Sequence, residues 1–250
     1  RLVEFTLEEI SSFIIKKMVE NAEEYLDRKI KKLVITVPAN FTDSQRKSTE
    51  QAAELAGVEV LRIINEPTAA ALAYGLQEKN EENKDGKILV FDLGGGTFDV
   101  TILQITKDKE SNNEKDKAKK NDILETKGNQ LKFDVLATNG DKFLGGEDFD
   151  NKLADDILDK FCKDNDESKE EVRKDKKAIK RLKIACENIK KVLSYNEQAT
   201  LCINHFYNNK DIDRIVTKKD FETLCDDLFE KIMKPLDDAL IDKKITEQEI

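Results

Sequence analysis

The sequence contains no tryptophan, two methionines, three prolines and one histidine, His205, among 250 residues. Its four cysteines never form a CxxC pair, so a zinc site has weak support. Free thiols in a reducing compartment explain these cysteines better than a disulfide framework does. No apolar run reaches the ~20 residues that a membrane-spanning helix needs, and no secretory signal opens the chain. The cysteines are Cys162, Cys186, Cys202 and Cys225.

Positive charge is also scarce, because 43 Lys and Arg residues face 52 Asp and Glu residues, for a net charge of -9. No basic face stands out, which disfavours a nucleic-acid partner and an anionic membrane surface. A Walker-type GxxxxGK[ST] loop is absent. Hydrophobic residues make up 38% and recur in periodic runs, so the chain has enough apolar residues for one large domain or two small ones.

The first 75 residues alternate helical and strand patterns, which is typical of an α/β fold with a buried sheet. Capping boxes at Thr6 with Glu9 and at Thr42 with Gln45 mark two helix starts, and Pro67 fits a first helical turn. The expected elements are a helix up to Tyr25, a strand over 33–37, a helix from Thr42 to Gly57, a strand over 58–64 and a helix over 68–74 that ends at Gly75.

The second half of the chain changes character. Residues 106–130, approximately, form a charged segment with little to bury, which predicts an exposed, mobile insertion in a hairpin connection. A strand over 131–137 and a turn over 139–141 follow. Beyond Gly146 the pattern predicts a separate α+β lobe, with helices over about 147–162, 171–193 and 218–240, strands over 199–207 and 212–216, and a turn at 208–209.

The most informative stretch runs from Ile88 to Val100, with the sequence ILVFDLGGGTFDV. Two β-rich arms flank Gly94, Gly95, Gly96 and Thr97, which predicts a hairpin whose tip has a bare backbone. A phosphate can approach glycine N–H groups closely. Asp92 and Asp99, one on each arm, supply the oxygen ligands that a phosphate-bound metal requires. An ordinary glycine turn is the alternative, but three consecutive glycines exceed what a two-residue turn needs.

Three further segments are candidates for chemistry, each with a plainer alternative. Glu66 lies where a strand meets a helix, a common place for ligand sites, although it also suits a helix N-terminus electrostatically. Gly145 and Gly146 open a helix and could offer N–H groups to an anion, or act only as a hinge. The last segment shares one helical face that could hydrogen-bond a nucleoside, or simply face solvent: Glu187, Lys190, Lys191 and Ser194.

Together these segments resemble the nucleotide-binding domain of the seventy-kilodalton heat-shock chaperones over nearly the whole chain, except the insertion. The motifs that carry the resemblance are VPANF with QR at 37–46, RIINEPTAAA at 62–71, FDLGGGTFDV at 91–100 and LGGEDFD at 144–150. The family's fold is that of actin and hexokinase, with ribonuclease H-like lobes facing each other across a cleft. The resemblance implies a partial version of this fold: residues 1–80 complete the first lobe's lower half, residues 81–144 and 226–250 belong to the second lobe's lower half, and residues 145–225 form its α+β upper half.

The resemblance also implies roles for individual residues, with ATP or ADP, Mg²⁺ and, as a further candidate, K⁺ as cofactors. Gly94, Gly95 and Gly96 would cradle the phosphates with Thr97 beside the γ-phosphate, and Gly145 and Gly146 would approach from the other side. Asp92, Asp99 and Glu66 would hold Mg²⁺, mostly through water, and Glu66 would be the catalytic carboxylate. Glu187, Lys190, Lys191 and Ser194 would line the adenosine pocket, although Lys191 replaces an arginine common in the family. Pro38 and Arg46 would form a switch that reports the nucleotide state.

We therefore expect an ATPase domain of a protein-folding chaperone, present as a central fragment, because a second phosphate hairpin and a later lysine are absent from these residues. The implied partners are J-domain proteins, nucleotide-exchange factors and, through a peptide-binding domain outside these residues, unfolded clients. The expected compartment is the cytoplasm, with the endoplasmic reticulum and the mitochondrion as alternatives. Two other functions stay open: a non-catalytic module that binds an exchange factor, and another actin-fold enzyme such as a sugar kinase.

Overall fold

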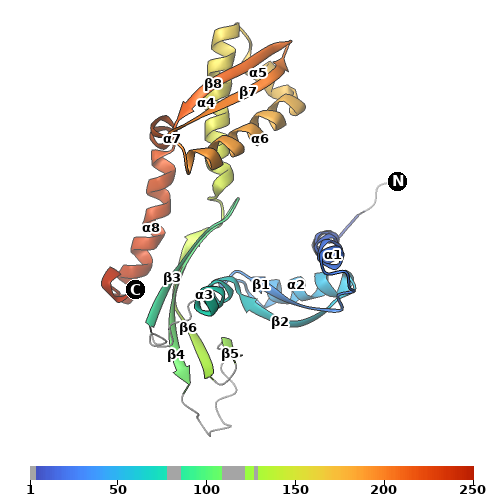
Figure 1. Ribbon diagram of the computed structural model, residues 1–250, viewed down its shortest axis with the longest axis vertical. Helices are drawn as coiled ribbons and strands as arrows, with labels where there is room; N and C mark the ends of the chain where they lie inside the picture. The colour runs from blue at the N-terminus through green and yellow to red at the C-terminus, as the bar shows by residue number, and fades with distance from the viewer. Residues whose placement is uncertain (1–3, 78–85, 109–121, 127–128) are drawn as a thin grey trace. The chain divides into compact units, whose positions relative to one another are not determined.

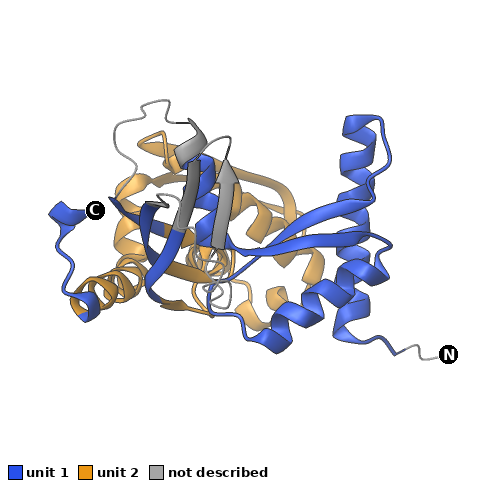
Figure 2. Cartoon of the chain, turned by 90° about the horizontal axis from the view of Figure 1, so that it is seen from below, with its two compact units in different colours: residues 1–90, 101–138, 242–250 blue, residues 91–100, 139–241 orange. Residues whose placement is uncertain are grey.

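The computed structural model describes residues 4–77, 86–108, 122–126 and 129–250 (Figure 1). The chain divides into two compact units, which Figure 2 shows in blue and orange. Unit 1 comprises residues 1–90, 101–138 and 242–250, and unit 2 comprises residues 91–100 and 139–241. The chain therefore crosses between the units several times, so neither unit is a continuous segment. The assignment of lobes and half-lobes from the resemblance stays a prediction.

Unit 1 begins with the two capped helices that the sequence predicts. The Thr6 N–H donates to Glu9 Oε2 over 2.7 Å, and the Glu9 N–H donates to Thr6 Oγ1 over 3.2 Å, which starts α1 (Leu7–Leu26). A second capping box at Thr42 starts α2 (Asp43–Leu55). This helix ends before Gly57, whose φ of 87° lies in the left-handed region that glycine adopts readily. Both predicted helix starts are confirmed.

Helix α2 connects two parallel strands, β1 (Lys32–Val37) and β2 (Glu59–Asn65), in a βαβ unit. Helix α3 (Glu66–Gln77) follows β2 directly, with Pro67 buried in its first turn. The predicted stop at Gly75 is wrong, because α3 continues to Gln77. A glycine inside a helix lowers the stability of the helix by only about 1 kcal/mol relative to alanine, so other interactions can keep the helix intact beyond it. Ala71 of α3 packs with the buried side chains of Leu103 and Phe133.

A four-stranded sheet has the order β3-β4-β6-β5, formed by Gly86–Leu93, Phe98–Asp108, Asn129–Asp141 and Asp122–Thr126 respectively. Residues 109–121 and 127–128 of the predicted insertion lie outside the described residues, while the end of β4, all of β5 and the start of β6 occupy the rest. The predicted turn at 139–141 is wrong, because these residues extend β6. Gly140 is needed there for close packing, since a Cβ would lie 2.1 Å from the Phe98 carbonyl oxygen.

Unit 2 contains α4 (Gly146–Asn165), α5 (Lys169–Lys174), α6 (Lys176–Leu193), the antiparallel strands β7 (Gln198–Tyr207) and β8 (Lys210–Thr217), then α7 (Lys218–Leu224) and all but the last two residues of α8 (Asp226–Lys243). Asn208 and Asn209 connect β7 to β8 with φ values of 49° and 57°, which confirms the predicted turn. Two predicted helices are each interrupted. Asp175 caps a new helix by accepting the N–H groups of Lys177 and Ala178, and α7 ends at Leu224, with Cys225 as its C-cap.

The core of unit 2 lies between the β7–β8 hairpin and the helices α4 and α6. Alternate residues of β7 are buried, as a strand with one covered face requires, and the Phe206 ring meets Phe161 of α4 edge-on at 4.9 Å. All four cysteines are free thiols. Burial raises the pKa of Cys186 to about 12 and that of Cys225 to about 11. No helix in the described ranges is long and apolar enough to cross a membrane.

Candidate functional site

The predicted glycine hairpin is present, with residues 94–97 connecting β3 to β4. The Gly94 N–H donates to the Thr97 carbonyl oxygen over 2.8 Å, which closes the turn. The rings of Phe91 and Phe98 lie 4.7 Å apart between centroids, so packing fixes the two arms beside the tip. A Cβ built on Gly95 or on Gly96 would meet no atom within 4 Å. Open space therefore adjoins the backbone of these two glycines.

The second glycine pair binds the hairpin directly. The Gly146 N–H donates to the Gly94 carbonyl over 2.9 Å, and the Glu147 N–H donates to the Gly95 carbonyl over 2.7 Å. Gly145 is buried against the same turn, where an added Cβ would lie 2.3 Å from the Gly95 carbonyl oxygen. The first turn of α4 thus satisfies two of its free N–H groups with hairpin carbonyls. The structure brings the two predicted glycine segments together through their backbones.

The two hairpin carboxylates lie close enough to influence each other. Asp92 is exposed and Asp99 is half-buried. Burial, with a further contribution from repulsion by Asp92, raises the pKa of Asp99, and the ammonium of Lys142 opposes part of this shift. A cation between or beside the carboxylates would relieve their repulsion. Among the residues that the structure describes, no group of three metal-ligating side chains is found, so a cation here would need further ligands from water or a nucleotide.

The raised pKa of Asp99 predicts a stability effect of known sign. Between the ordinary pKa of 3.8 and the raised value, the folded state holds more protons than the unfolded state, so stability falls as pH rises through this window. The loss persists at neutral pH. We therefore expect Asp99→Asn to raise the melting temperature at pH 7. We also expect the melting temperature of this variant to fall less steeply than that of the parent chain as pH rises above 4. Thermal unfolding across pH 3 to 8 measures this, with the exposed Asp155→Asn as control. A lower melting temperature for Asp99→Asn at pH 7 would contradict it.

The predicted face of α6 divides into an inward and an outward part. Lys190 Nζ donates to the Gly146 carbonyl over 2.8 Å and lies 2.8 Å from both carboxylate oxygens of Asp150. Glu187 instead pairs with Lys191 over 2.6 Å near the surface, and this hydrogen bond lowers the pKa of Glu187. Ser194 Oγ donates to the Lys190 carbonyl over 3.4 Å. Lys190 therefore binds the second glycine pair directly, through the Gly146 carbonyl.

A cavity of about 500 Å³ connects the hairpin to α6 within unit 2. This volume is in the range of small-molecule sites. Five predicted residues line it, from both glycine segments and from α6: Gly94, Gly95, Gly146, Lys190 and Ser194. Gly96, Thr97, Gly145, Glu187 and Lys191 do not line it. The cavity thus brings an open glycine backbone, an ammonium group and a hydroxyl into one space.

Sequence reasoning missed the apolar wall of this cavity. Phe149 contacts Phe229 and Phe221, with ring centroids 5.1 Å and 6.3 Å apart. Phe149 of α4 lies far in sequence from Phe221 of α7 and Phe229 of α8, and each resembles an ordinary core residue in a helical pattern. The other residues that were missed are Leu93, Leu193, Lys218 and Glu222. An apolar wall beside polar groups suits a flat aromatic ring with a polar attachment.

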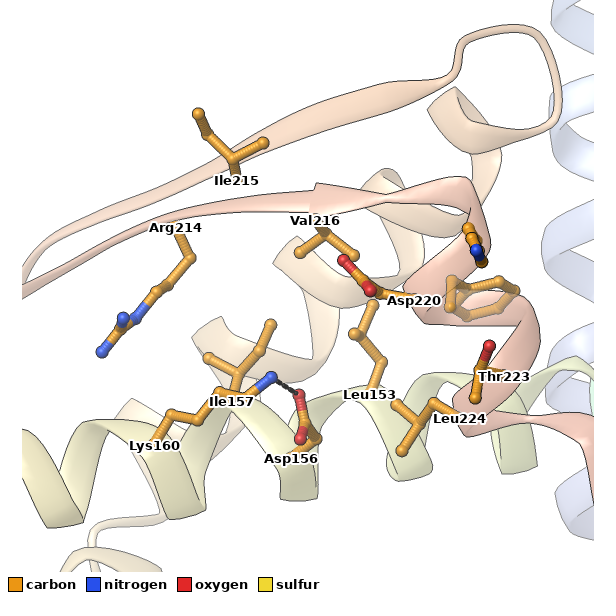
Figure 3. A pocket seen from close by; sticks show the side chains of 12 residues that line it. Leu153, Asp156, Ile157, Lys160, Arg214, Ile215, Val216, Asp220, Thr223 and Leu224 are labelled. Atoms are coloured by element: carbon orange, nitrogen blue, oxygen red, sulfur yellow. Dashed lines mark hydrogen bonds and ion pairs between the residues drawn. The ribbon is translucent and has the colours of Figure 1, made fainter.

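A second cavity of about 340 Å³ lies between α4, β8 and α7 (Figure 3). Its floor is apolar, with Leu153 and Ile157 of α4 among its residues, and Asp156 pairs with Lys160 at its rim over 2.7 Å. None of the predicted site residues lines it, although Phe221 lines both cavities. We assign the candidate site to the larger cavity, because only that one adjoins the glycine hairpin.

Unit 1 contains the remaining predicted residues. Arg46 Nη2 donates to Asn65 Oδ1 over 2.7 Å and approaches the Pro38 carbonyl at 3.5 Å, and Nε donates to the Phe41 carbonyl over 3.3 Å. The structure thus joins the two predicted switch residues. Arg46 thereby also contacts Asn65, the residue directly before Glu66. Glu66 itself is half-buried at the start of α3. Glu66 belongs to unit 1 and the hairpin tip to unit 2, so a shared role for them stays a prediction.

In a comparison with known proteins, residues 2–113 and 121–250 of this chain match the family described as "Hsp70 protein". Heat shock cognate 70 kDa protein 3 of Dictyostelium discoideum is 41% identical over 246 residues, which cover 98% of this chain and 35% of that protein. Heat shock 70 kDa protein of Neurospora crassa is 41% identical over 98% of this chain and 34% of its own length. Chaperone protein dnaK of Cyanidioschyzon merolae is 43% identical over 98% and 36%. The chain thus spans about a third of the length of these relatives.

Proposed function

The chain belongs to the Hsp70 family, whose fold is the actin-like ATPase fold, and from this we propose that it forms part of the nucleotide-binding domain of an ATP-hydrolysing chaperone. The observation that carries the proposal is the 500 Å³ cavity of unit 2. Its lining combines the open backbone of Gly95 with an aromatic wall, the Lys190 ammonium and the Ser194 hydroxyl. This arrangement suits a molecule with an aromatic base at one end and phosphates at the other.

In this proposal ATP or ADP binds with its phosphates at Gly94, Gly95 and Gly96, beside Thr97. The absence of any atom within 4 Å of a built Cβ at Gly95 and Gly96 supports this position. Gly145 and Gly146 act by holding the hairpin tip in place, since the N–H groups of Gly146 and Glu147 already bind its carbonyls. The nucleoside occupies the cavity beside Lys190 and Ser194. Glu187 and Lys191, which pair at the surface of α6, would complete the adenosine site.

Asp92 and Asp99 would hold Mg²⁺, mostly through water, because their mutual repulsion favours a cation between them. The bound Mg²⁺ would supply charge neutralisation for the phosphates. K⁺ is a further candidate beside the same carboxylates. Glu66 would orient the attacking water from its place at the end of β2, where ligand sites in α/β sheets gather. Catalysis would then consist of positioning and charge stabilisation rather than covalent chemistry.

The proposal extends to how the nucleotide is sensed. Arg46 contacts the carbonyls of the 38–41 loop and the Asn65 side chain next to Glu66, so a movement of Glu66 could be passed to Pro38. A peptide-binding domain outside these residues would respond by changing its hold on unfolded clients. J-domain proteins and nucleotide-exchange factors would be the partners, and the cytoplasm the compartment. Membership of the family is also the basis for the proposed half-lobes. Residues 1–80 belong to the first lobe, residues 81–144 with 226–250 to the lower half of the second lobe, and residues 145–225 to its upper half.

We predict that residues 1–250 alone bind Mg·ADP but hydrolyse ATP at least about 100-fold more slowly than a protein with a complete site, because each missing phosphate contact costs a large factor. The motivating observation is that these residues contain a single Gly-rich hairpin. Single-turnover hydrolysis of bound ATP measures the rate. The comparison is a chimera in which this chain replaces the 246 matched residues of the Dictyostelium relative.

The two measurements separate the proposed functions. Binding of Mg·ADP without turnover by the isolated chain, together with turnover by the chimera, is the expected result. Turnover by the chain alone at the rate of the chimera would show that one hairpin suffices and would contradict the prediction. A chimera that neither binds nor hydrolyses nucleotide would favour the non-catalytic module that binds an exchange factor.

A further inference from the structure

Asp150 has no role in the proposed nucleotide site, yet it is buried in the first turns of α4, with 8% of its surface exposed. A buried carboxylate is costly unless it is paired. Its partner is Lys190 of α6, whose Nζ lies 2.8 Å from both carboxylate oxygens. Both side chains are largely buried, since 12% of the Asp150 side chain and 24% of the Lys190 side chain are exposed. Solvent therefore screens this pair less than it screens the surface pairs of the chain.

Lys190 connects this carboxylate to the glycine hairpin. Its Nζ also donates to the Gly146 carbonyl over 2.8 Å, and a Cβ built on Gly146 would lie 3.0 Å from the same nitrogen. The Gly146 N–H donates to the Gly94 carbonyl, and the Glu147 N–H donates to the Gly95 carbonyl. Both polar backbone groups of Gly146 are thus held, one by Lys190 and one by the hairpin.

The donors of the Lys190 ammonium are largely used inside the protein. An ammonium has three N–H donors, and two of them bind Asp150 and Gly146. One donor is left for a molecule in the cavity that Lys190 lines. A lysine stem is flexible, and its ammonium is strongly hydrated, so a carboxylate partner is what keeps it at the Gly146 carbonyl.

We propose that Asp150 is a positioning residue that acts through Lys190 to hold the first turn of α4 against the glycine hairpin. The inference rests on the proposed function, because it assigns to this pair the geometry of the phosphate part of the nucleotide site. Asp150 itself does not line the cavity. Loss of its charge frees Lys190 to swing to solvent, loosens Gly146 and Glu147, and so loosens the hairpin tip.

The test compares two Asp→Asn variants of the same helix. Asp150→Asn removes the inward pair, whereas Asp155→Asn removes an outward pair with Arg173 in which both side chains are more than half exposed. In the 250-residue chain without nucleotide, amide hydrogen exchange at Gly146 and Glu147 should become about tenfold faster in Asp150→Asn, as expected for the loss of a charge-assisted hydrogen bond. Asp155→Asn should exchange as the parent chain does. Unchanged exchange in Asp150→Asn would overturn the proposal.

Two further measurements separate this role from a direct contact with nucleoside. Asp150→Asn should weaken Mg·ADP by about tenfold more than it weakens adenosine, because both molecules lose their contact with Lys190 but only Mg·ADP also loses the support of the hairpin tip. Equal losses for both molecules would overturn the proposal. The double variant Asp150→Asn, Lys190→Met leaves no unpaired buried charge, so it should fold and still show the faster exchange. If the parent chain binds no Mg·ADP, the proposed function fails, and the exchange result still decides the role of Asp150.

Discussion

Replacing Gly145 by alanine is expected to lower the free energy of unfolding by about 3 kcal/mol, the upper part of the range for overpacking. The new methyl group would lie 2.3 Å from the Gly95 carbonyl oxygen and 2.4 Å from Gly96 N. Both are backbone atoms, so no side-chain rotation can relieve the clash. Either α4 or the hairpin tip must move, and the hydrogen bonds from Gly146 and Glu147 to the hairpin carbonyls would be lost.

Gly95→Ala is the matched control, because its methyl group would enter open space. Urea unfolding should show a loss of less than about 1 kcal/mol for Gly95→Ala, as for a change without a steric clash. Mg·ADP titration should nevertheless show weaker binding, since the methyl group would occupy the space proposed for a phosphate. Equal stability of the two variants would contradict the packing of Gly145. Unchanged Mg·ADP affinity in Gly95→Ala would remove this glycine from the phosphate site.

Glu66→Gln is expected to reduce ATP hydrolysis about 100-fold in the chimera with the Dictyostelium relative, the order of magnitude lost when a reacting group is poorly positioned. The amide keeps the size of the carboxylate but lacks its negative charge and one of its two acceptor oxygens, so it orients the attacking water less well. Affinity for Mg·ADP should stay within about twofold, because the lost interaction belongs to the transition state. Single-turnover rates and calorimetric titration measure the two quantities.

The control for this variant is Glu59→Gln at the other end of the same strand. Glu59 pairs with Lys32 at the surface and has no place in the proposed site. Its replacement should leave both hydrolysis and Mg·ADP affinity unchanged. Normal turnover in Glu66→Gln would remove Glu66 from the mechanism, and an equal loss of Mg·ADP affinity would indicate a binding role instead of a catalytic one.

Local chemistry made much of the fold predictable. Some features depend only on neighbouring residues, and the structure confirms each of them: the capping boxes at Thr6 and Thr42, the strand over 33–37 and the Asn208–Asn209 turn. The glycine hairpin is equally local, because two β-rich arms separated by a short glycine segment predict a tight turn, and glycine adopts any backbone conformation that the turn requires. Features of this kind can be inferred from a single sequence without knowing what packs against them.

Features that depend on distant neighbours could not be predicted. Gly140 suggested a turn, but the Phe98 carbonyl, from another strand, is what excludes a side chain there. The continuous apolar pattern over 171–193 hid the break at Asp175, where a side chain competes for helix N–H groups. Likewise Lys190 shares a helical face with Glu187 and Lys191, yet only Lys190 finds a buried carboxylate. The aromatic wall of the cavity comes from three helices and has no signal in any one of them.

The most direct test of the account is a titration of the ¹⁵N-labelled 250-residue chain with Mg·ADP, followed by the amide shifts in NMR spectra. The predicted result is a saturable shift at Gly94, Gly95, Gly146 and Ser194, which line the larger cavity, with Lys160 and Ile215 of the second cavity unchanged. Shifts centred on the second cavity, or none at millimolar Mg·ADP, would contradict a nucleotide site at the glycine hairpin.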